Sequence, residues 1–91
     1  MNEIRLFVQP GCRPCIQVEN LLKKVDDWQS AIRLVNIQEN EEFAKYCGVI
    51  GTPTLVGLQD GKVVAKLTGP EHLTFDFFLN LVRKHGKGTP K

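Results

Sequence analysis

Two cysteines three residues apart, Cys12 and Cys15, separate a short apolar run from a segment with helical periodicity. Residues 3–8 (EIRLFV) are typical of a strand, and residues 9–11 are turn residues. Apolar residues then recur at helical spacing from about residue 12 to 25, which predicts a helix. Cys12 is therefore expected at a helix N-terminus, where free N–H groups and the helix dipole stabilise a thiolate. Such a pair beside a βαβ pattern indicates dithiol–disulfide exchange.

The rest of the chain completes an α/β pattern. The predicted elements are a strand at 31–37, a short helix at 39–47, strands at 54–58 and 62–67, and a last helix opened by Gly69 and Pro70 that runs to about residue 84. Asp60 and Gly61 between the last two strands are a hairpin signal. The order is β-α-β-α-β-β-α, with a right-handed parallel βαβ unit first. We expect one domain at 1–85 and a flexible C-terminal tail at 86–91.

Composition narrows the class of protein. A chain of 91 residues forms one small domain, and a net charge of +2 gives no argument for nucleic acid or an acidic membrane as partner. No apolar stretch approaches the ~18 residues of a membrane span, and the N-terminus does not resemble a signal peptide. Three cysteines in such a chain favour a cytoplasmic protein and a catalytic disulfide over a structural one.

Within the pair, position predicts different roles. Cys12 is expected to be the exposed nucleophile, with the neighbouring cation of Arg13 helping to lower its pKa from the free value of about 8.5. Cys15, one turn further in, is expected to be the buried resolving thiol. The alternatives are a buried core pair or half of a zinc site, for which only Cys47, His72 and His85 remain as scattered ligands. We therefore expect no metal.

The third cysteine, the two histidines and the tryptophan are expected to have structural roles or to lie at the surface. Cys47 is expected to pack in the core at a helix end, with a regulatory or dimerising thiol as the alternative. His72 and His85 are expected on the surface of the last helix. Trp28 is expected to cover the core where the first helix ends.

A second motif, Gly51-Thr52-Pro53-Thr54, stands directly before a β-rich run. With the strand leading into CRPC, the DGK hairpin and Gly69, it makes residues 3–85 resemble the thioredoxin/glutaredoxin superfamily. The resemblance implies a thioredoxin-like fold, a four-stranded mixed sheet with three helices. It also implies that Pro53 is cis and faces the two cysteines, and that the backbone of Thr52 pairs with an extended substrate segment. Arg13 and Pro14 are then further substrate-binding candidates.

The chain departs from the superfamily in specific places. Thioredoxins carry a buried carboxylate six residues before the first cysteine and a lysine near it on the neighbouring strand. These positions are Leu6 and, by alignment, Leu34, so both charges are absent together. No buried acid then assists proton transfer at Cys15. The glutathione-binding pattern of glutaredoxins is also absent, and Gly69-Pro70-Glu71 is a partial echo of it.

The resulting functional prediction is a monomeric oxidoreductase that reduces protein disulfides. It needs no bound cofactor, and its electrons come from a reductase or a small thiol. The alternatives are a thioredoxin-fold binding module without catalysis, and metal or iron–sulfur binding through Cys12. The sequence leaves the substrate, the electron donor and the redox potential open.

Overall fold

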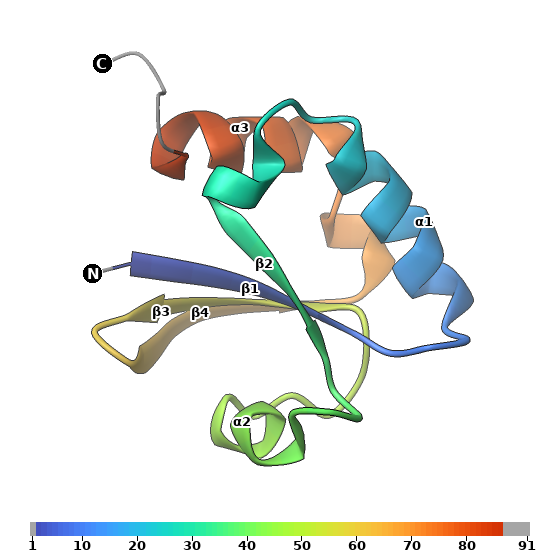
Figure 1. Ribbon diagram of the computed structural model, residues 1–91, viewed down its shortest axis with the longest axis vertical. Helices are drawn as coiled ribbons and strands as arrows, with labels where there is room; N and C mark the ends of the chain where they lie inside the picture. The colour runs from blue at the N-terminus through green and yellow to red at the C-terminus, as the bar shows by residue number, and fades with distance from the viewer. Residues whose placement is uncertain (1, 87–91) are drawn as a thin grey trace.

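A computed structural model describes residues 2–86, which form a four-stranded mixed sheet in the order β2-β1-β3-β4 (Figure 1). The strands are β1 (Asn2–Val8), β2 (Ile32–Asn36), β3 (Thr54–Gln59) and β4 (Lys62–Thr68). β1 pairs in parallel with β2 and antiparallel with β3, and β3 pairs antiparallel with β4. The predicted α/β, thioredoxin-like fold class is confirmed.

Three α-helices cover the sheet from both sides. α1 (Arg13–Lys23) and α3 (Phe75–His85) lie on one face, and the short α2 (Glu41–Tyr46) lies on the other (Figure 1). Two short 3₁₀ turns, η1 (Trp28–Ser30) and η2 (Pro70–His72), lead into β2 and α3. No helix in residues 2–86 is both long and apolar enough to cross a membrane.

The alternation of β1 divides the core into two parts. Ile4, Leu6 and Val8 point to the side of α1 and α3, where they pack with Cys15 in the larger cluster. Phe7 points to the opposite side and packs under α2 in the smaller cluster. Because successive side chains of a strand point to opposite faces, this one strand anchors both halves of the core.

The hairpin follows from local chemistry. Asp60 and Gly61 have φ of +52° and +83°, the left-handed values that an Asp-Gly hairpin turn requires. Gly48 has φ of +72° directly after Cys47, the C-cap of α2, as expected for a glycine that ends a helix.

The last helix begins later than the sequence pattern predicted. Gly69 and Pro70 open the turn η2, and α3 starts at Phe75, with Thr74 as its N-cap. The side-chain oxygen of Thr74 accepts a hydrogen bond of 3.1 Å from the N–H of Phe77. Proline suits the first position of any helical turn. Pro70 therefore begins the single turn η2 and not the long helix α3. Of the predicted tail at 86–91, residues 87–91 lie outside the described residues.

Candidate active site around Cys12 and Cys15

Cys12 and Cys15 form a disulfide at the N-terminus of α1, with their Cα atoms 5.2 Å apart. Cys12 is the N-cap residue, and its Sγ accepts a hydrogen bond of 3.2 Å from the N–H of Cys15. Pro14 stands in the first helical turn, where its missing donor costs no hydrogen bond. Cys12 is half-buried, whereas Cys15 is completely buried. Cys12 is therefore the more accessible of the two cysteines, although it is half-buried and not exposed as expected.

A loop 40 residues away in the sequence meets this disulfide. The Thr52–Pro53 peptide bond is cis, as the resemblance implied. The Thr52 hydroxyl donates a hydrogen bond of 3.5 Å to the Sγ of Cys12, and the carbonyl oxygen of Thr52 lies 3.9 Å from the same sulfur. Pro53 itself is buried. The resemblance implies a role for the backbone of Thr52 alone, whereas the structure shows that its side chain also contacts Cys12.

Two hydrogen bonds hold the loop in place. The carbonyl oxygen of Pro53 accepts from the N–H of Gly69, at 3.0 Å, which fastens the start of β3 to the end of β4. The hydroxyl of Thr54 is fully buried and donates to the carbonyl oxygen of Gly51, at 2.6 Å. Neither Thr54 nor Gly69 was predicted to support the site, although the glycine, with φ of +105°, adopts a conformation that other residues rarely take.

The floor of the site is apolar. Leu6 is completely buried on the same face as Cys15, and it pairs in register with Leu34 of β2, which is half-buried. The pairing confirms that the two alignment positions are neighbours. Among residues 2–86, Thr54 is the only polar residue that is buried, and no charged residue is buried. The core beneath Cys15 therefore contains no carboxylate in the described part of the chain.

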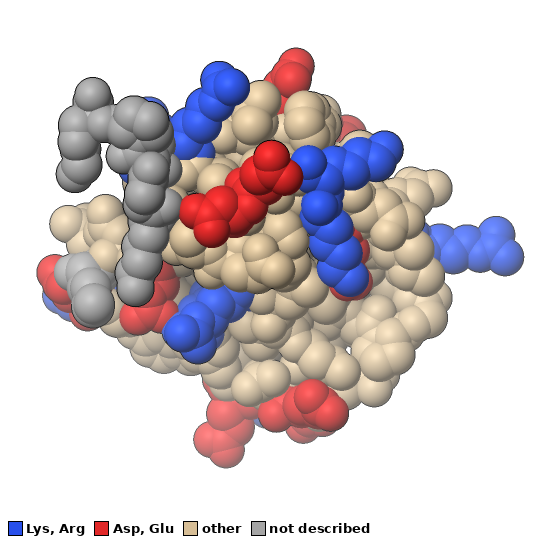
Figure 2. Space-filling model, turned by 45° about the horizontal axis from the view of Figure 1, so that its top comes forward, with Lys and Arg blue, Asp and Glu red and all other residues tan. Residues whose placement is uncertain are grey.

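The remaining predicted site residues lie at the surface. Arg13 and Pro14 are exposed on the first turn of α1, beside the disulfide in the chain. Their exposure leaves both side chains accessible to a partner. Over the face shown in Figure 2, acidic and basic side chains are intermingled and form no single-sign patch among the residues described there.

The other cysteine and the histidines lie away from this site. Cys47 is buried in the smaller core cluster at the end of α2, and burial raises the pKa of its thiol. Its predicted packing role fits this position. His85 is exposed on α3, as predicted, whereas His72 is exposed but lies in η2, before that helix. Trp28 packs against the larger cluster, as predicted. Within residues 2–86, no three His, Cys, Asp or Glu side chains come together as a metal-binding group.

Comparison with known proteins identifies this arrangement. The family described as "Thioredoxin domain" matches residues 2–71, from the start of β1 through the cis-proline loop to η2. The chain belongs to the thioredoxin family. It is 35% identical over 66 residues to thioredoxin of Bacillus subtilis, a match covering 69% of this chain and 64% of that protein.

Two further relatives extend the match over more of the chain. Thioredoxin of Chlamydia pneumoniae is 30% identical over 81 residues, which cover 87% of this chain and 78% of that protein. The solved structure of a mutant thioredoxin from Halobacterium salinarum superposes with a TM-score of 0.71 at 26% identity, covering 98% of this chain and 78% of that one. The chain thus spans less than two thirds of the Bacillus subtilis relative but most of the other two.

Proposed function

We propose that this thioredoxin-family chain is a dithiol–disulfide oxidoreductase that reduces protein disulfides through Cys12 and Cys15. The observation that carries the proposal is the disulfide at the N-cap of α1, with its outer sulfur half-exposed and its inner sulfur buried. The membership of the thioredoxin family supports it independently.

The reaction takes two thiol–disulfide exchanges. The Cys12 thiolate attacks one sulfur of the substrate disulfide, forms a mixed disulfide and displaces the other substrate sulfur as a thiolate. The Cys15 thiolate then attacks the Sγ of Cys12, closes the Cys12–Cys15 bond and displaces the second substrate thiolate. Two electrons pass to the substrate, whose thiolates take the two protons lost by Cys12 and Cys15.

The surroundings of Cys12 suit this chemistry. The N–H of Cys15 and the hydroxyl of Thr52 both point a hydrogen at its sulfur, so both stabilise negative charge there. The apolar floor at Leu6 offers no proton acceptor to Cys15, and water or the departing thiolate takes its proton. We infer that Cys12 is activated by hydrogen bonds and the helix terminus, without a buried acid.

The loop at Thr52 is the proposed docking edge for substrate. Within residues 2–86, the N–H of Thr52 bonds to no other backbone group, and the residue is half-exposed beside the disulfide. An extended substrate segment can therefore pair with this backbone as an added strand. Pro53 shapes the loop, and the exposed Arg13 and Pro14 on the first turn of α1 are the further proposed substrate contacts.

The partners and setting follow from the same proposal. The oxidised protein returns to the dithiol form through a reductase or a small thiol. We propose a monomer that works in a reducing compartment such as the cytoplasm. Arg13 favours the thiolate and hence the reduced form, so the potential should be less reducing than the roughly −270 mV of thioredoxin.

Two measurements test the function. The first is the reduction of a disulfide-bonded protein substrate by the pre-reduced chain, in which Cys12→Ser should abolish turnover. The second is trapping, in which Cys15→Ser should accumulate a mixed disulfide with substrate because the resolving attack is lost. If the Cys12→Ser/Cys15→Ser double variant retained the cellular function of the wild type, the chain would be a binding module instead.

A further inference from the structure

Ile50 is the most exposed large apolar residue in the described part of the chain, with a relative exposure of 99%. It stands two residues before Thr52, whose hydroxyl contacts the sulfur of Cys12. Because two residues of chain span at most about 7 Å, Ile50 lies at the edge of the disulfide site. A substrate that reaches Cys12 therefore also comes close to this isoleucine.

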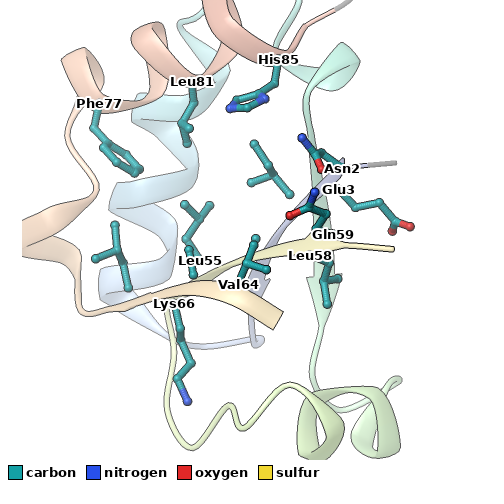
Figure 3. A pocket seen from close by; sticks show the side chains of 14 residues that line it. Asn2, Glu3, Leu55, Leu58, Gln59, Val64, Lys66, Phe77, Leu81 and His85 are labelled. Carbon is teal, nitrogen blue, oxygen red and sulfur yellow. The ribbon is translucent and has the colours of Figure 1, made fainter. Parts of the chain in front are cut away.

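The loop of residues 48–53 holds Ile50 in this exposed position. On the N-terminal side, Lys66 of β4 donates to the carbonyl oxygen of Gly48, at 2.9 Å. Figure 3 shows the Lys66 side chain extending away from α3, on the other side of the sheet. Val49, directly before the exposed isoleucine, packs against the smaller core cluster. The backbone that leads into Ile50 is therefore fixed by a hydrogen bond and by core packing.

The loop is fastened on the C-terminal side of Ile50 as well. The carbonyl oxygen of Gly51 accepts from the hydroxyl of Thr54, at 2.6 Å, and that of Pro53 accepts from the N–H of Gly69, at 3.0 Å. Single exposed apolar residues are common on protein surfaces. Ile50 differs because turning it inward would break at least one of these contacts. It is thus held outward in advance, and ordering it costs little when a partner covers it.

The surroundings of Cys12 are open and apolar on the helix side too. Ile16 follows one turn later, where its N–H donates to the carbonyl oxygen of Cys12, at 3.1 Å, and it is 52% exposed. Gly11 and Gly51 directly precede Cys12 and Thr52. Apart from chain neighbours, a Cβ at either glycine would meet no atom of the described residues within 4 Å. The backbone of a partner can therefore approach the disulfide closely.

We propose that Ile50, assisted by Ile16, selects protein disulfides whose reacting cysteine has an uncharged apolar residue about two positions away. The inference rests on the proposed reduction of protein disulfides through Cys12. An apolar side chain that covers Ile50 removes apolar surface of both partners from water. The spacing follows from the two residues between Ile50 and Thr52. Arg13 predicts the opposite preference, because its cation would favour acidic residues beside the cysteine.

The test uses peptides that each carry one cysteine as a mixed disulfide with thionitrobenzoate. They differ only two positions before and after the cysteine, where both residues are leucine, serine or glutamate. Reduced Cys12 attacks the peptide sulfur and displaces the coloured thionitrobenzoate, and Cys15 then displaces the peptide as a thiol. The leucine peptide should react faster than the serine peptide by about three- to tenfold. Ile50→Ser should bring this ratio close to one, and Ile16→Ser should lower it in part.

The ratio within each variant cancels any change in the reactivity of the thiolate itself. The matched control is Val64→Ser, since Val64 is 62% exposed on β4 and lines the hollow beneath α3, away from the disulfide (Figure 3). It should keep the wild-type ratio.

Three results would overturn the proposal and leave disulfide reduction intact: a wild-type ratio near one, a ratio unchanged in Ile50→Ser, or a glutamate peptide that reacts faster than the leucine peptide. The last result would assign selection to Arg13. No reaction of the reduced wild type with any peptide would instead overturn the proposed function, and this inference with it.

Discussion

The side-chain hydroxyl of Thr52 lies 3.5 Å from the sulfur of Cys12, although 40 residues separate them in the chain. A hydroxyl so placed donates to a thiolate more strongly than to a neutral sulfur, and it therefore favours the reduced, ionised form of Cys12.

Replacing this hydroxyl is the most direct probe of the site. Thr52→Val keeps the shape and the backbone but removes the donor. We expect a slower reaction of reduced Cys12 with iodoacetamide at neutral pH, with the alkylation midpoint moved to higher pH. If the lost hydrogen bond contributes about 1 kcal/mol to the reduced form, the redox potential of the variant should be more reducing than that of the wild type by roughly 20 mV.

Thr54→Val serves as the control for that experiment, because Thr54 bonds to Gly51 and not to sulfur. It should lower stability without a direct effect on Cys12. A potential unchanged in Thr52→Val would show that the hydroxyl does not stabilise the thiolate.

The apolar floor makes a second prediction. Leu6→Asp would place a carboxylate in a completely buried position and should lower the free energy of unfolding by about 3–5 kcal/mol. Leu34→Lys alone should cost much less, because Leu34 is half-buried and a lysine stem can reach water.

Urea unfolding of the two single variants and the double variant measures the coupling. Because Leu6 and Leu34 are register partners, the double variant should be more stable, by at least about 1 kcal/mol, than the sum of the two single losses predicts. Strict additivity would mean that the two positions cannot form an ion pair in this fold.

Gly69 makes a third prediction, since it has φ of +105° and its N–H bonds to Pro53. Gly69→Ala should cost about 1–3 kcal/mol of stability, because residues with a Cβ rarely adopt this conformation. It should also slow disulfide exchange, because the strain acts on the loop that carries Thr52.

Gly57→Ala is the matched control, since Gly57 lacks a positive φ and a Cβ there would meet Ala65 at an ordinary 3.5 Å. Thermal unfolding and turnover should both be near wild type in that variant. Equal losses in the two variants would refute the argument from φ.

Cys47 predicts a pH dependence of stability. Burial raises the pKa of its thiol above its ordinary value, so the folded chain holds this proton more tightly than the unfolded chain. The contribution is fully present below the ordinary pKa of the thiol and is lost as pH rises through the raised pKa of the folded chain. Urea midpoints at about pH 7 and about pH 10 should differ more for the wild type than for Cys47→Ala. Equal differences in the wild type and in Cys47→Ala would show that the pKa of Cys47 is the same in the folded and the unfolded chain.

Local signals predicted much of this molecule. The Asp60-Gly61 turn, the helix after Cys12 and the packing of Cys47 each follow from nearby residues, and the sequence was sufficient for them. The predicted start of α3 was wrong because Pro70 and Thr74 both resemble helix starts, and only the packing of α3 on α1 decides between them. The contact of Thr52 with Cys12 depends on how two distant segments of the chain meet, which no local pattern contains.

The hydrogen bond from the N–H of Cys15 to the Sγ of Cys12 belongs to the backbone of α1 and is already made in the oxidised protein. Its donor needs no new partner when the disulfide opens, because the same sulfur then carries the charge. The reorganisation required between the two redox states is therefore small at Cys12. A reductase and a substrate would meet nearly the same surface, and the two states would be told apart by charge rather than by shape.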